Sequence, residues 1–158
     1  MDKINQLFEH LNIFHAYIAA PFPSDIENFF NNHPEKIAGI SFIAPNEINN
    51  SAFKNSGKKI MIMSSDTGAT HSAALSLKKK IPDIRTFEIK NYEILPWTDL
   101  AIDYPTELAE NISTYFSELP CKDTNPSKPN MQGKIDDIHY TVQGSGPPLI
   151  LLPFTLSA

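Results

Sequence analysis

The sequence contains little cysteine, little positive charge and no long apolar run, and each shortage excludes a class of protein. Its single cysteine, Cys121, excludes an internal disulfide and offers no metal-ligand spacing. The formal net charge is −5 with no basic stripe, so we expect no nucleic-acid partner. The longest apolar run, at residues 148–154, is far shorter than the ~20 residues of a membrane span. The first residues are unlike a signal peptide, so we predict a cytoplasmic protein. We also expect no membrane partner and no cofactor.

Apolar runs and turn signals alternate along the chain in the order expected of an α/β protein. With 158 residues and 41% hydrophobic content, the chain is long enough for one domain with a core. Short unbroken apolar runs indicate buried strands, and apolar residues spaced three and four apart indicate helices. This pattern predicts a three-layer, mostly parallel sheet joined by right-handed crossovers. The predicted strands lie at 14–20, 37–44, 58–66 and 84–89, and the predicted helices at 3–12, 24–33, 70–80 and 105–119.

Local signals predict where several of these elements begin and end. Ser24 is followed three residues later by Glu27, which is the capping-box spacing, so Ser24 is predicted as the N-cap of the second helix. Pro105 suits the first position of the last helix. Residues 47–57, which are polar and rich in asparagine, are predicted as a loop, and so are residues 91–104.

Composition changes after the last predicted helix. Residues 120–133 contain three prolines and no apolar period, which is typical of a linker. Beyond it, residues 138–143 alternate as a strand does, and residues 148–152 are fully apolar. The chain is therefore divided into a domain at 1–119, a linker at 120–133 and a β-hairpin at 134–158.

Asp66 is the first candidate functional residue. It follows the unbroken apolar run of the third predicted strand and precedes a predicted helix. Ligand-binding and catalytic groups of open α/β sheets gather beyond the carboxyl ends of the strands, where Asp66 is expected to lie.

Several stretches together resemble the α/β-hydrolase family. HPEKIAGISFIAP at 33–45 is similar to the strand that follows the nucleophile helix, and residues 1–119 as a whole resemble the C-terminal half of that fold. Residues 81–99 resemble the last strand and the loop that carries the catalytic histidine. Residues 135–154 resemble the opening hairpin of a second copy. The resemblance implies a serine-hydrolase fold in permuted or tandem order.

The family's catalytic triad is incomplete in this sequence. Its chemistry needs a serine on a G-x-S-x-G elbow, a histidine that takes the proton, and an acid that orients the histidine. The resemblance places the elbow at residues 18–22, with Ala20 at the nucleophile position. It places Ile94 at the histidine position, and Asp66 at the triad-acid position. Since alanine cannot attack an acyl carbon and isoleucine cannot accept a proton, we expect no catalysis by this chain alone.

Other residues offer alternative chemistry. Ser24 lies four residues beyond Ala20 and is a candidate displaced nucleophile, although helix capping explains it better. His71 lies five residues after Asp66 and could pair with it, although a helix-surface histidine is the simpler interpretation. Residues 64–68 precede a helix and could bind an anion there, against which the charge of Asp66 argues. The other histidines are scattered without metal-ligand spacing.

Three functional hypotheses follow. The first is a non-catalytic α/β-hydrolase-like binding or scaffolding protein, either as a pseudo-enzyme or as the truncated product of a longer tandem chain. The second is a carboxyl-ester hydrolase of the esterase or lipase class that uses Ser24 or a serine from a partner chain. The third is a fragment of a longer chain that carries a methyltransferase module. We also expect another protein chain to pair with an exposed sheet edge.

The resemblance also predicts an arrangement of strands. In the family, the strand that corresponds to residues 148–152 lies beside the nucleophile strand. The expected sheet order is therefore 149–152, 14–20, 37–44, 59–64, 84–89.

Overall fold

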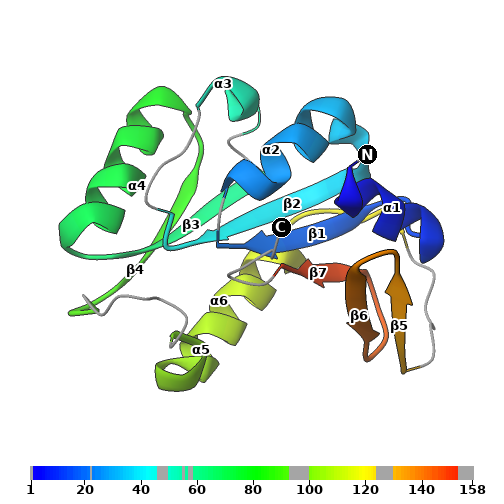
Figure 1. Cartoon of the computed structure of the whole chain (residues 1–158). Coiled ribbons are helices and arrows are strands. Elements are labelled where there is room, and N and C mark those ends of the chain that lie inside the picture. Colours follow the sequence, from blue (N-terminus) through cyan, green and yellow to red (C-terminus); the bar gives the residue numbers. More distant parts are fainter. Residues whose placement is uncertain are drawn as a thin grey trace.

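A five-stranded parallel sheet forms the centre of the computed structural model and is covered by helices on both faces (Figure 1). The structure describes residues 2–21, 23–45, 50–54, 56, 59–92, 100–123 and 130–152. The strand order is β4-β3-β2-β1-β7. Together these features give an α/β fold of the three-layer kind. The strands are β1 (Ala16–Ala20), β2 (Ile37–Ile43), β3 (Ile60–Ser65), β4 (Arg85–Ile89) and β7 (Leu149–Leu151).

The helices divide unequally between the two faces. Helix α6 covers one face, with the short helix α5 beside it, and four helices cover the other face (Figure 1). Within the described residues, no helix is both long and apolar enough to span a membrane. The helices are α1 (Lys3–His10), α2 (Pro23–Asn32), α3 (Asn50–Phe53), α4 (Gly68–Lys80), α5 (Leu100–Asp103) and α6 (Pro105–Ser117), and the 3₁₀ turn η1 is Pro34–Lys36.

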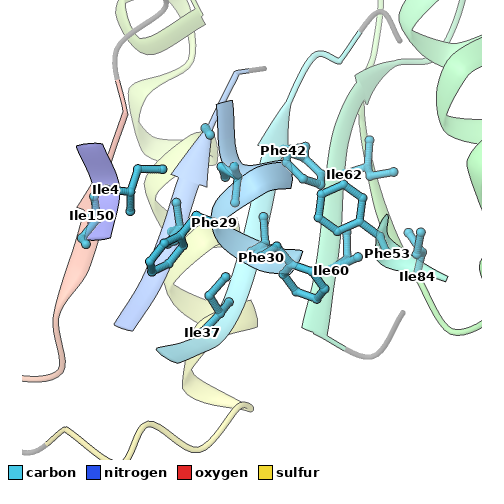
Figure 2. Close-up of a cluster of buried hydrophobic side chains, with 14 of the residues drawn as sticks. Ile4, Phe29, Phe30, Ile37, Phe42, Phe53, Ile60, Ile62, Ile84 and Ile150 are labelled. Carbon is cyan, nitrogen blue, oxygen red and sulfur yellow. The ribbon is translucent and has the colours of Figure 1, made fainter. Parts of the chain in front are cut away.

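Alternation of side chains along each strand produces two cores. Ile18, Ile40 and Ile62 point toward the face that carries α1, α2, α3 and α4, and Figure 2 shows part of this larger core. Tyr17 and Met61 point the other way and pack against α6. Because both faces are covered, the inner strands are apolar on both sides, as a buried parallel sheet requires.

Strand β7 lies beside β1, as the sequence predicted. It runs parallel to β1, with Leu149 opposite Tyr17 and Leu151 opposite Ala19. Two backbone hydrogen bonds of 2.9 Å flank this pairing, from the amide of Tyr17 to the carbonyl of Pro148 and from the amide of Leu152 to the carbonyl of Ala19. The expected order of the five strands is therefore confirmed.

The antiparallel hairpin lies elsewhere than predicted. It consists of β5 (Met131–Ile135) and β6 (Ile138–Val142), which form a separate two-stranded sheet. Its first strand begins inside the range predicted as linker, whereas β7 leaves the hairpin and pairs with the main sheet. The reason is local: Asp136 adopts a φ of 51°, which permits the tight turn between Ile135 and Ile138.

Three further local expectations were wrong. Residues 50–53 of the predicted loop at 47–57 form helix α3, because Phe53 is fully buried against Phe30 and Phe42. Residues 100–103 of the predicted loop at 91–104 form α5. Helix α2 begins at Pro23, so Ser24 lies inside the first turn and is not the N-cap.

Candidate functional site

The parallel strands β1 to β4 end at one edge of the sheet, and this edge is the candidate functional site. Ala20 is the last residue of β1, and Asp66 directly follows β3. Groups from different strands meet at such an edge in α/β proteins. Ile94, at the predicted histidine position, and Trp97 lie in the segment 93–99, outside the described residues.

Ala20, which the resemblance predicts as the nucleophile position, offers no reactive group and no strained backbone. Ala20 is fully buried, and its methyl group belongs to the core shared with Ile18. Its φ lies outside the left-handed region. Two non-glycine residues in that region do occur where the strands end, but they are Ala44, just after β2, with a φ of 52°, and Asn91, two residues beyond β4, with a φ of 58°. At Ala20 itself the backbone is therefore that of an ordinary strand.

The side chain of Asp66, just after β3, binds a backbone amide just after β4. Its Oδ1 accepts a hydrogen bond of 2.9 Å from the amide of Asn91, two residues beyond β4. The hydroxyl of Ser65 lies 3.4 Å from the same oxygen. The partners of Asp66 in the described chain are therefore an amide and a hydroxyl, and neither is an imidazole.

His71 contacts a different carboxylate from the one expected. Its Nδ1 lies 3.3 Å from Oε1 of Glu88 on β4, without the alignment of a hydrogen bond. This nitrogen has no hydrogen-bond partner among the described residues, and the described hydrogen bonds of Asp66 involve Asn91 and Ser65, so the possible pairing of His71 with Asp66 is not formed. The sequence interpretation missed Glu88, although its place in an alternating strand was a usable signal.

A buried serine lies close to this histidine–glutamate contact. Ser64 is opposite Glu88 in the pairing of β3 with β4, so both side chains point to the face that carries α4. The Oγ of Ser64 is fully buried and has no hydrogen-bond partner in the described structure. A substrate in solution has no access to this hydroxyl, so Ser64 does not complete a triad with His71.

Ser24 lies exposed in the first turn of α2. Among the described residues, no hydrogen bond connects it to a histidine. A serine hydroxyl without an adjacent base is a weak nucleophile. Within the part of the chain that the structure describes, Ser24 therefore has no histidine base of the kind that a displaced nucleophile requires.

The turn before α4 uses its polar groups internally. The amide of Ser65 donates to Oγ1 of Thr70 at 3.1 Å, and the amide of Thr67 donates to Oγ of Ser65 at 3.4 Å. These contacts hold the turn against α4, and the carboxylate of Asp66 lies within it. The arrangement therefore does not favour an anion at this helix start.

Neither similarity to known proteins nor the arrangement of metal-binding side chains assigns a function to this edge of the sheet. No family model matches the chain, and neither does any curated protein or solved structure. Within the residues that the structure describes, histidine, cysteine and acidic side chains form no group of three that could hold a metal ion. The likeness to α/β-hydrolases therefore rests on the sequence motifs.

Proposed function

We propose that this chain is an α/β-hydrolase-like protein that does not catalyse acyl transfer by itself and acts as a binding or scaffolding protein. The observation that carries the proposal is the pair of triad positions at the carboxyl edge of the sheet. Ala20 presents a buried methyl group, and Asp66 is bound to the amide of Asn91. Acyl transfer needs a hydroxyl and a base at that edge.

The order of the strands supports the family assignment within this proposal. The resemblance to α/β-hydrolases predicted that the strand at 149–152 lies beside the nucleophile strand at 14–20, and β7 pairs with β1. Most alternative placements of a short apolar strand would have contradicted that requirement. A shared strand order supports a shared ancestry of fold, but a fold alone does not carry an activity.

The two outermost strands of the sheet, β4 and β7, differ in a way that bears on pairing with another protein chain. Strand β4 carries exposed Arg85 and Glu88, and charges of this kind protect an edge from pairing. Strand β7 instead exposes Leu149 and Leu151. The contrast supports β7 as the edge that pairs with another protein chain.

Ester hydrolysis tests the absence of catalysis. We would measure nitrophenyl-ester turnover by the wild type, Ser24→Ala and the matched variant Ser76→Ala, which removes another exposed helix serine. We expect the same low background for all three, because neither hydroxyl has a base. Turnover that Ser24→Ala abolishes and Ser76→Ala preserves would overturn the proposal.

One observation favours a second candidate function. The contact of 3.3 Å between Nδ1 of His71 and Oε1 of Glu88 places a carboxylate beside an imidazole, which are two of the three groups of a hydrolase triad, so a partner chain could supply the serine. Turnover would then rise with the square of protein concentration at low concentration. His71→Gln would abolish that turnover, whereas the matched His139→Gln on the hairpin would leave it unchanged. Turnover absent at every concentration would exclude this candidate.

A further inference from the structure

Residues 119–123, here called the strap, cross the start of β1 and are held there by contacts from three neighbouring residues. The strap follows α6, which is yellow-green in Figure 1, and leads toward the hairpin β5–β6. The Tyr17 hydroxyl donates to the Leu119 carbonyl, and the Phe14 amide donates to Asp123 Oδ2 at 3.0 Å. His15 accepts two hydrogen bonds: its carbonyl accepts from Cys121 Sγ at 3.2 Å, and its Nδ1 accepts from the Lys122 amide at 2.8 Å.

His15 is the titratable member of this set. Its side chain is buried, and Nδ1 must be unprotonated in order to accept the hydrogen bond from Lys122. Burial lowers the pKa of His15, and the positive charges of Lys59 and Lys122 lower it further. The carbonyl of Ile37 and the carboxylate of Asp123 act in the opposite direction. The neutral ring is therefore the form that fits the closed strap.

We propose that His15 is an acid-sensitive latch, and that protonation of its ring opens the strap. A proton on Nδ1 would place two donors, this N–H and the amide of Lys122, against each other. The hydrogen bond at 2.8 Å would be lost, and the charged ring would be buried beside two lysines. The least costly relief is for residues 119–123 to leave the start of β1, which exposes the ring to water.

The sign of the pH dependence follows from the direction of the pKa shift. The open state binds a proton more readily than the closed state, because the closed strap adds to the burial of His15 and places Lys122 beside it, and both lower its pKa. The closed strap is therefore fully stable above the ordinary histidine pKa of 6.5 and weakens as the pH falls below it. One proton limits the rise of the opening constant to about tenfold per pH unit, until the lowered pKa is reached.

Opening would expose Cys121, which gives the proposal a direct readout. The thiol is partly buried, and Sγ donates to the carbonyl of His15, so it moves with the strap. It is the only cysteine in the sequence, so labelling by a thiol reagent reports on one site. Burial also raises the pKa of this thiol, so the reagent must react under acidic conditions.

The test is labelling of Cys121 by 4,4′-dithiodipyridine between pH 7.5 and 5, normalised at each pH to the rate for N-acetylcysteine. The wild type should become more reactive as the pH falls, with a slope approaching tenfold per unit. His15→Asn offers an amide oxygen as an acceptor that does not titrate, so its normalised rate should change less than about twofold. The matched variant His139→Asn, on the exposed surface of β6, should respond as the wild type does. A flat wild-type profile, or an acid response that persists in His15→Asn, would overturn the proposal.

Hydrogen exchange of the wild type provides a second test that needs no variant. The amide of Lys122 should lose protection as the pH falls from 7 to 5, after correction for intrinsic exchange, while the amides of Ile40 and Ile62 in the central strands keep theirs. Protection of Lys122 that is unchanged, or that falls together with these core amides, would contradict a local latch.

Discussion

The contact between α6 and the middle of β2 gives the sharpest test of the packing described here. Gly39 is buried in β2, and a Cβ atom placed on it would lie 2.6 Å from Cδ1 of Leu119 and 3.2 Å from Cε1 of Phe116. Both of these residues are also in contact with Tyr17. The Phe116 ring stacks on Tyr17 at 4.6 Å, and the Leu119 carbonyl accepts the Tyr17 hydroxyl.

Opposing terms set the expected size of the effect of Gly39→Ala. Replacing glycine in a strand gains about 0.5–1 kcal/mol of backbone entropy, and a buried methyl group adds about 0.8 kcal/mol. Overpacking costs about 1–3 kcal/mol, and a contact of 2.6 Å places this site toward the upper end. We therefore expect Gly39→Ala to lower the free energy of unfolding by about 1 kcal/mol.

A double-mutant cycle separates this clash from other causes. The free energy of unfolding would be measured by urea titration with far-UV circular dichroism for Gly39→Ala, Leu119→Ala and the double variant. Because Leu119→Ala removes the clashing carbon and so relieves most of the overpacking cost, the double variant should be more stable than additivity predicts by about 2 kcal/mol or more. Leu108→Ala, on α6 and away from Gly39, should be additive with Gly39→Ala. Additive behaviour for Leu119 as well would refute the packing argument.

Two further predictions concern β7 and Tyr115. Ile150 is buried in the core, whereas Leu151 is 68% exposed. Ile150→Ala should therefore lower the free energy of unfolding, measured by urea titration, by about 2 kcal/mol or more, and Leu151→Ala should lower it by less than about 0.5 kcal/mol. Equal effects of the two substitutions would mean that β7 is not docked on the sheet. Burial raises the pKa of Tyr115 above its ordinary value of 10, so the unfolded state releases the phenolic proton first and stability should fall as the pH rises through 10. Tyr115→Phe should remove that part of the slope in alkaline unfolding titrations, and an unchanged slope would contradict it.

Local patterns in the sequence were sufficient for most of the fold. The unbroken apolar run at 60–63 predicted a strand covered on both faces, and β3 is buried along its whole length. Pro105 begins α6 as expected. Asn12 follows α1 with a φ of 53°, which explains why a helix can stop there. These features depend on neighbours in the chain, so a local reading of residues suffices to predict them.

Contacts between distant segments decided what the sequence interpretation missed. Phe53 lies in a stretch rich in asparagine, and its helix exists because Phe30 and Phe42 bury its ring. At the candidate site, the partner of Asp66 is a backbone amide 25 residues away, and no side-chain pattern encodes a backbone amide.

By itself, the sequence determined the α/β class of the fold, because periodicity and residue type carry that information, and the resemblance to a known family predicted the order of the five strands. The tertiary structure alone decided which groups became partners. His71 contacts Glu88 and not Asp66, and His15 accepts a hydrogen bond from an amide 107 residues away. The physical reason is that hydrogen bonds are satisfied by proximity in space, which only the packing of the sheet and the helices establishes.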